Sequence, residues 1–141
     1  MCELFAPGCC VILIDSSVWI DLLRERQTVP VFRVRRILLE ELACIAPVIL
    51  QELLQGARSG AQLSLLRSRF SALPMLSPST ATYAEAGALF ARCRWAGITP
   101  RSPHDCLIAQ IAIEHAVPLL HDDRDFERMA EVEPRLRLVS G

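Results

Sequence analysis

The 141-residue sequence contains no lysine and no asparagine, and arginine supplies all 15 of its strongly basic side chains. The missing lysine excludes several kinds of active site, because P-loop nucleotide hydrolysis, Schiff-base chemistry and lysine-dependent phosphorelay all need an ammonium group. The formal net charge is −1, but residues 16–101 carry eleven arginines against six acids and residues 102–141 carry four against eight. This distribution suits a protein that binds a polyanion and acts on it with bound cations.

Long apolar runs are also missing. A membrane-spanning helix needs about 18 consecutive apolar residues, and the longest candidate, residues 4–14, is interrupted by Pro7 and Gly8. No basic residue precedes this segment, so it lacks the first part of a secretory signal. We therefore expect no membrane association and a cytoplasmic location.

Glycine and proline are few, at 6 and 9 residues, while 52% of the chain is hydrophobic, which indicates one globular domain rather than a disordered chain. The six cysteines form no CxxC motif. Cys44, Cys93 and Cys106 lie in apolar segments and are predicted to be buried thiols. The other three lie in residues 1–10, which we interpret as a leader that precedes a domain of residues 11–141.

Short apolar strands alternate with helices along the chain. The predicted strands cover residues 11–14, 44–46, 75–76, 117–120 and 136–139. The predicted helices cover residues 18–24, 30–42, 48–55, 61–73, 80–95, 103–115 and 126–130. Ser16 and Ser17 are the expected N-caps of the first helix. The alternation predicts an α/β fold, a three-layer α/β/α sandwich around a central, mainly parallel sheet.

Carboxylates occur where two of these strands end and on two of the helices. The residues are Asp15 after the first strand, Glu52 inside the third helix, Asp105 in the first turn of the sixth helix, and Asp122, Asp123 and Asp125 after the fourth strand. Carboxyl ends of parallel strands and helix N-termini face the same edge of such a sheet. Converging carboxylates repel one another and favour a bound cation, and oxygen ligands select Mg²⁺ or Mn²⁺ over Zn²⁺.

Each carboxylate also has a purely structural interpretation. Asp15 and Asp125 suit helix N-caps, and Asp105 stands three residues after Ser102, as in a capping box. Glu52 suits the solvated face of a helix. A shared site is favoured because all four places occur together in one small domain.

Four motifs in this order resemble the PIN domains, and more closely the VapC-type toxins of bacterial toxin–antitoxin pairs. They are ILIDSSVWID at residues 12–21, QELLQG at 51–56, PHDCLIA at 103–109 and LLHDDRDF at 119–126. The resemblance extends over residues 11–139. It implies a PIN-like sandwich and a Mg²⁺- or Mn²⁺-dependent endoribonuclease that cleaves structured RNA with metal-activated water. It also implies a homodimer and a cognate VapB-like antitoxin that holds the enzyme inactive.

The resemblance also implies roles for individual residues. Asp15, Glu52 and Asp105 match the first three acidic positions, which are both catalytic and metal-binding. The fourth position is Asp123 or Asp125, with Asp123 preferred. Ser17 matches a small hydroxyl residue that supports the site through a hydrogen bond. The chain departs from the family at His121, where threonine or serine is common.

Two other functions are compatible with parts of the sequence. A haloacid-dehalogenase-like phosphatase also has an aspartate after its first strand, but it needs a second one where this chain has Ser17, and it usually employs a lysine. The more serious alternative is a non-catalytic PIN-like interaction module. The clustered carboxylates argue against it, since such a module has no need of them, and failure to bind any divalent ion would favour it.

Overall fold

The computed structural model describes residues 11–139 of the chain. In sequence order its elements are β1 (Ile12–Ile14), α1 (Ser16–Leu23), α2 (Val29–Leu39), β2 (Ala43–Cys44), α3 (Pro47–Leu54), α4 (Gly60–Ser71), α5 (Thr80–Trp95), α6 (Pro103–Glu114), β3 (Leu119–Leu120) and α7 (Arg124–Val132). The predicted leader, residues 1–10, lies outside the described residues. None of the helices in residues 11–139 has the length and apolar character needed to cross a membrane.

The three strands form a parallel sheet in the order β2-β1-β3. Leu13 in the central strand pairs with Cys44 on one side and Leu119 on the other, and all three side chains are fully buried. Uniformly apolar strands of this kind are typical of parallel sheets covered on both faces. The mainly parallel central sheet predicted from the sequence is therefore confirmed.

The sheet is shorter at its edges than predicted. Instead of strands, residues 75–76 and 136–139 contribute one parallel bridge each, Ile45 to Met75 and Leu119 to Leu138. Pro74 and Pro78 bracket the first of these segments. Proline has no N–H to donate to a strand ladder, so pairing stops at each of these prolines. The segment between them is too short for more than one bridge.

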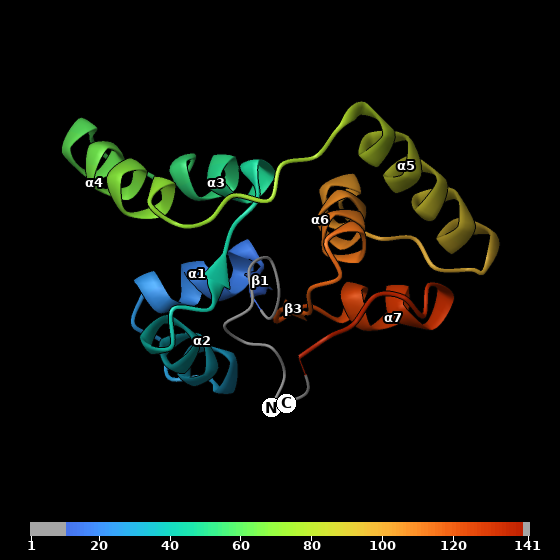
Figure 1. The fold of residues 1–141 in the computed structure, drawn as a ribbon, viewed down its shortest axis with the longest axis horizontal. Coiled ribbons are helices and arrows are strands. Elements are labelled where there is room, and N and C mark those ends of the chain that lie inside the picture. The colour runs from blue at the N-terminus through green and yellow to red at the C-terminus, as the bar shows by residue number, and fades with distance from the viewer. Residues whose placement is uncertain (1–10, 140–141) are drawn as a thin grey trace.

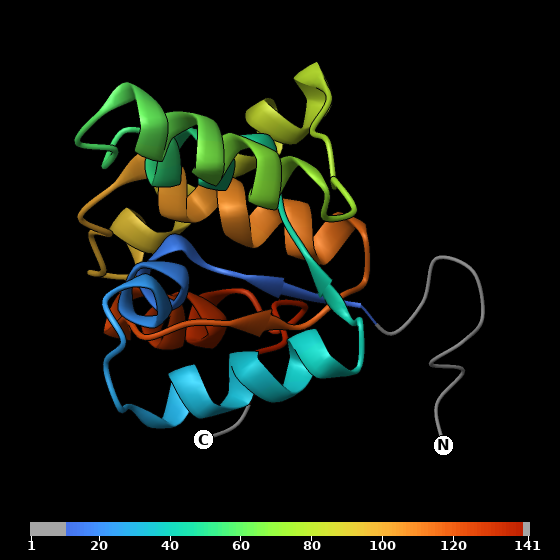
Figure 2. The same ribbon diagram turned by 90° about the vertical axis from the view of Figure 1, so that its left-hand side faces the viewer.

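Helices cover both sides of the strands. Figure 2 shows α3, α4 and α6 above the sheet and α2 below it. In Figure 1, α1 to α4 occupy one half of the molecule and α5 to α7 the other, with the strands between them. This arrangement confirms the α/β class and puts the starts of α6 and α7 close to the end of β1.

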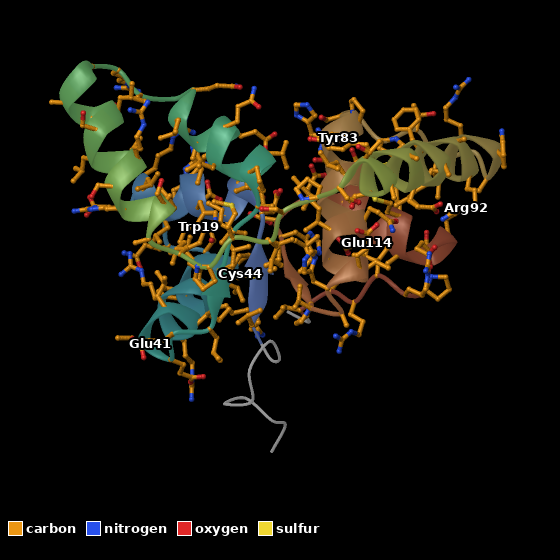
Figure 3. All side chains as sticks on the ribbon, turned by 45° about the horizontal axis from the view of Figure 1, so that its top comes forward. Trp19, Glu41, Cys44, Tyr83, Arg92 and Glu114 are labelled. Carbon is orange, nitrogen blue, oxygen red and sulfur yellow. The ribbon has the colours of Figure 1, made fainter. Side chains whose placement is uncertain are left out.

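One continuous apolar core joins the two halves. Trp19 of α1, labelled in Figure 3, meets Phe70 of α4 edge to face, with ring centroids 5.0 Å apart. Phe126 of α7 is fully buried in the other half. Cys44, Cys93 and Cys106 are free and buried, as predicted.

Asp15 is the N-cap of α1, so the prediction that Ser16 or Ser17 caps this helix is wrong. The backbone of Asp15 is extended, and its Oδ2 accepts the backbone N–H of Ser17 at 3.2 Å. A carboxylate in this position is stabilised by the free N–H groups and the positive end of the helix dipole. The helix therefore begins directly after the strand and leaves no loop between them.

Candidate metal centre

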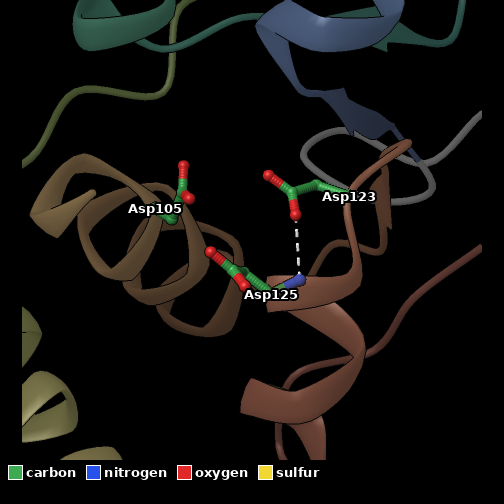
Figure 4. Close-up of side chains that lie close together, drawn as sticks. All are labelled: Asp105, Asp123 and Asp125. Atoms are coloured by element: carbon green, nitrogen blue, oxygen red, sulfur yellow. Dashed lines mark hydrogen bonds between the residues drawn. The ribbon is translucent and has the colours of Figure 1, made fainter. Parts of the chain in front are cut away.

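Three of the predicted carboxylates lie close together where α6 and α7 begin. Asp105 is in the first turn of α6, Asp123 is the N-cap of α7, and Asp125 is in the first turn of α7. One carboxylate oxygen from each lies within 4.8 Å of the others. Figure 4 shows the three side chains converging, with the backbone N–H of Asp125 bonded to Asp123. The fourth acid of this region, Asp122, is exposed and is not part of the group.

Asp15 reaches this group from the sheet. Its backbone N–H donates to the carbonyl of Leu120 at 2.9 Å, so the end of β1 lies beside the end of β3. Its side chain is buried, and burial raises its pKa, with a further contribution from the charge of Asp123. The Ser17 hydroxyl donates to Asp15 Oδ2 at 2.6 Å, the kind of contact that the resemblance implies for Ser17.

Glu52 borders the group on α3. Its Oε1 accepts the hydroxyl of Ser16 at 3.0 Å, and its Oε2 lies 3.7 Å from Nδ1 of His104. Burial raises the pKa of Glu52, the charge of Asp15 raises it further, and the contacts with Ser16 and His104 oppose the rise. A cleft of about 310 Å³ opens beside Glu52 and is also lined by Arg24 and Arg58.

The negative charge of the Asp105 carboxyl is also disfavoured by its surroundings unless a cation binds. Burial, as the largest cause, and the charges of Asp15, Asp123, Glu52 and Asp125 together raise its pKa from 3.8 to about 7. None of the side-chain hydrogen bonds within residues 11–139 ends on its carboxylate. A half-buried carboxyl surrounded by like charges, with carboxylate oxygens as the neighbouring ligands, fits a hard divalent cation.

The structure also tests the structural interpretations of these acids. Asp15 does cap a helix, but Asp125 does not, because Asp123 caps α7. At α6, the Ser102 hydroxyl accepts the N–H of His104 instead of that of Asp105, so the expected capping box is not formed. Capping therefore leaves the Asp105 carboxylate unexplained.

Three nearby residues were given no part in the site by the sequence analysis. Ser16 binds Glu52, as described above, and His121 Nδ1 accepts the backbone N–H of Asp123 at 3.1 Å. Arg101, which precedes α6, donates to both Asp123 and Asp125. In the sequence, His121 was noted only as a departure from the family pattern, and no feature distinguished Arg101 from the other arginines.

Comparisons with known proteins agree with this geometry. The PIN domain family matches residues 12–132. Ribonuclease VapC11 of Mycobacterium tuberculosis is 37% identical over 125 residues, which cover 86% of this chain and 93% of the relative. A VapC ribonuclease of Mycobacterium bovis matches equally well.

Solved structures give the same fold. A chain in the structure of DNA-bound VapBC from Salmonella typhimurium has a TM-score of 0.72 and 26% identity, covering 93% of this chain and 98% of that one. A chain of VapBC2 from Rickettsia felis, bound to a promoter DNA fragment, has a TM-score of 0.71 and 19% identity, covering 92% and 97%. The chain therefore belongs to the PIN-domain family and, within it, to the VapC ribonucleases.

Proposed function

We propose that this chain is the ribonuclease toxin of a VapBC-type toxin–antitoxin pair and that it cleaves structured RNA with the help of a divalent cation. The observation that carries the proposal is the convergence of Asp105, Asp123 and Asp125, with Asp15 and Glu52 beside them. The 37% identity to curated VapC ribonucleases supports the same activity.

The cation of this proposal is Mg²⁺ or Mn²⁺. Asp15 and Asp105 hold the principal ion, and Glu52 and Asp123 complete the acidic shell, with Asp125 as the alternative to Asp123. The oxygen-only cluster of Asp105, Asp123 and Asp125 supports a hard divalent cation, and the effect of the Asp15 and Glu52 charges on the pKa of Asp105 supports their place beside it. When bound, such an ion activates water and stabilises negative charge on the phosphodiester.

The protein's own groups orient these ligands and move the proton. Ser17 holds Oδ2 of Asp15, and Ser16 holds Oε1 of Glu52, which fixes the orientation of both carboxylates. Glu52 Oε2, near His104, has the raised pKa that suits a group accepting a proton from water. Hydrolysis by water leaves a 5′-phosphate and a 3′-hydroxyl on the products, because the RNA 2′-hydroxyl takes no part.

We further propose a VapB-like antitoxin and a second copy of the chain as protein partners. The structures from Salmonella typhimurium and Rickettsia felis are VapBC complexes, and a third match is a toxin–antitoxin complex from Klebsiella pneumoniae. The proposed place of action is the cytoplasm, because the RNA substrate is found there.

The test is cleavage of total cellular RNA by antitoxin-free protein, with Mn²⁺ or with EDTA, followed by mapping of the new 5′ ends. Wild type is compared with Asp15→Asn and with Asp21→Asn. Asp21 is a suitable control because it lies on the helix that Asp15 caps, pairs with Arg26 at 3.3 Å and is not part of the acidic group. We expect Mn²⁺-dependent cuts at defined sites from wild type and Asp21→Asn, and none from Asp15→Asn. No cuts from folded wild type would favour the non-catalytic interaction module.

A further inference from the structure

Arg101 binds two carboxylates of the candidate metal centre at once. It lies in the segment between α5 and α6, and its guanidinium Nη2 donates to Oδ1 of Asp123 at 2.8 Å. Its Nε donates to Oδ2 of Asp125 at 3.3 Å, and its backbone N–H donates to the same oxygen at 2.9 Å. The three bonds connect the segment that leads into α6 with the first turn of α7.

These bonds engage only one oxygen of each carboxylate. Oδ1 of Asp123 also accepts the N–H of Asp125, so that oxygen has two donors, as does Oδ2 of Asp125. Within residues 11–139, no hydrogen bond ends on Oδ2 of Asp123 or on Oδ1 of Asp125. Each carboxylate is therefore held in one orientation while its second oxygen stays available to a ligand.

The contact differs from an ordinary surface ion pair. The side chain of Asp125 is 7% exposed and that of Asp123 is 21% exposed, whereas the side chain of Arg101 is 76% exposed. The Arg101–Asp123 bond is exposed, but the two bonds to Asp125 end on a buried carboxylate, where charge-assisted hydrogen bonds are stronger than between two solvated groups. The planar guanidinium also fixes the angle between its two acceptors, which an ammonium group does not do.

We propose that Arg101 is a positioning residue of the metal centre, which holds Asp123 and Asp125 so that the free oxygen of Asp123, or of Asp125 as the alternative ligand, is available to the divalent ion of Asp15 and Asp105. The inference rests on the metal site of the proposed function. It makes a prediction opposite to that of simple electrostatics. Removing a positive charge beside a cation site strengthens ion binding by Coulomb attraction, whereas removing a positioning group weakens it.

The experiment is calorimetric titration of the metal-free protein with Mn²⁺. Wild type is compared with Arg101→Gln, with Arg101→Lys and with Arg36→Gln as control. Arg36 is an exposed arginine on α2 that pairs with Glu40 at 3.5 Å, so its variant removes the same charge elsewhere. Circular dichroism checks that each variant is folded.

We expect Arg101→Gln to weaken Mn²⁺ binding roughly tenfold or more, the usual cost of losing a group that orients a metal ligand. Arg101→Lys keeps the charge but loses the paired geometry, so we expect it to bind Mn²⁺ weakly as well. We expect Arg36→Gln to bind Mn²⁺ like wild type.

A second readout separates positioning from contact with RNA. We expect Arg101→Lys to need more Mn²⁺ for half-maximal RNA cleavage, with KM for RNA unchanged. A raised KM with unchanged Mn²⁺ affinity would instead make Arg101 an RNA contact and overturn the proposal.

The titration also distinguishes this inference from the proposed function. Mn²⁺ binding by Arg101→Gln as tight as by wild type, or tighter, overturns the inference alone, as does full affinity in Arg101→Lys. Wild type that binds no Mn²⁺ overturns the metal site itself. Should Arg101→Gln not fold, the comparison of Arg101→Lys with wild type decides the matter.

Discussion

The hydroxyl of Ser16 donates a 3.0 Å hydrogen bond to Oε1 of Glu52, which follows it by 36 positions in the chain. The neighbouring hydroxyl, that of Ser17, donates instead to Asp15. Successive residues of a helix point about 100° apart, so two adjacent serines orient carboxylates on different elements. Ser16 thereby connects the first turn of α1 to the middle of α3.

Replacing Ser16 with alanine should slow RNA cleavage without unfolding the protein. A hydrogen bond to a charged group contributes about 1.5–3 kcal/mol, so losing this one should lower kcat by roughly ten- to a hundredfold. Steady-state cleavage of a defined RNA measures the effect. Ser68→Ala, an exposed serine on α4, is the matched control and should behave like wild type. Equal cleavage rates for the two variants would show that Ser16 does not support the site.

The close group of acids was predictable from the sequence because topology determines it. Parallel strands bring Asp15 and the segment after β3 to one edge, and a helix N-terminus brings Asp105 to the same place. The positions of these acids depend only on where the strands and helices begin and end. Apolar runs and prolines in the sequence indicate those ends. Which of the three loop acids joins the group depends on side-chain contacts, and the sequence left that choice open.

The contacts made by Arg101 and Ser16 could not be predicted in this way. Arg101 is one of 15 arginines, and nothing in its neighbours distinguishes it from the solvated ones. Ser16 and Ser17 are the same residue type side by side, and only the direction of each side chain on α1 decides its partner. Such contacts require the distances between elements, which local patterns do not contain.

The position of α7 depends on Phe126, which is fully buried and packs near His121 with ring centroids 5.4 Å apart. Phe126→Leu should lower the free energy of unfolding by about 1–2 kcal/mol, because it removes buried volume without adding a polar group. Urea unfolding in EDTA measures this change.

The control for this substitution is Trp95→Leu, since Trp95 is 82% exposed. Surface changes of this kind usually stay within about 0.5 kcal/mol. An unfolding free energy for Phe126→Leu as high as that for Trp95→Leu would mean that the packing of Phe126 contributes little. We also expect Phe126→Leu to weaken Mn²⁺ binding, because α7 carries Asp125 and is capped by Asp123.

Asp105→Asn should abolish RNA cleavage and yet stabilise the metal-free protein. The carboxyl loses its charge in a group where burial and four neighbouring carboxylates disfavour ionisation. We expect a rise in Tm of about 2–5 °C in EDTA at pH 8. Asp122→Asn, an exposed acid outside the group, should change neither quantity. Cleavage by Asp105→Asn at the wild-type rate would show that Asp105 has no part in catalysis and serves only the start of α6.

The raised pKa of Asp105 also predicts how the stability of the metal-free protein depends on pH. Between its ordinary value of 3.8 and its folded value of about 7, the folded chain keeps a proton that the unfolded chain has released. The associated stabilisation is complete below pH 3.8 and is lost as the pH rises through 7. The pKa values of Asp15 and Glu52 are raised as well, so their contributions have the same sign.

Metal-free wild type should therefore be less stable at pH 8 than at pH 5.5, and added Mn²⁺ should raise its Tm more at pH 8, where the carboxylates are ionised. Thermal unfolding in EDTA and in Mn²⁺ across this range measures both effects. The range avoids Glu133, whose pKa is lowered by Arg135 and which titrates only below its ordinary value of 4.5. Asp105→Asn provides the reference, since it lacks the titrating carboxyl and should show a smaller loss of stability between pH 5.5 and 8. Parallel pH profiles for wild type and variant would contradict the assignment of the raised pKa to Asp105.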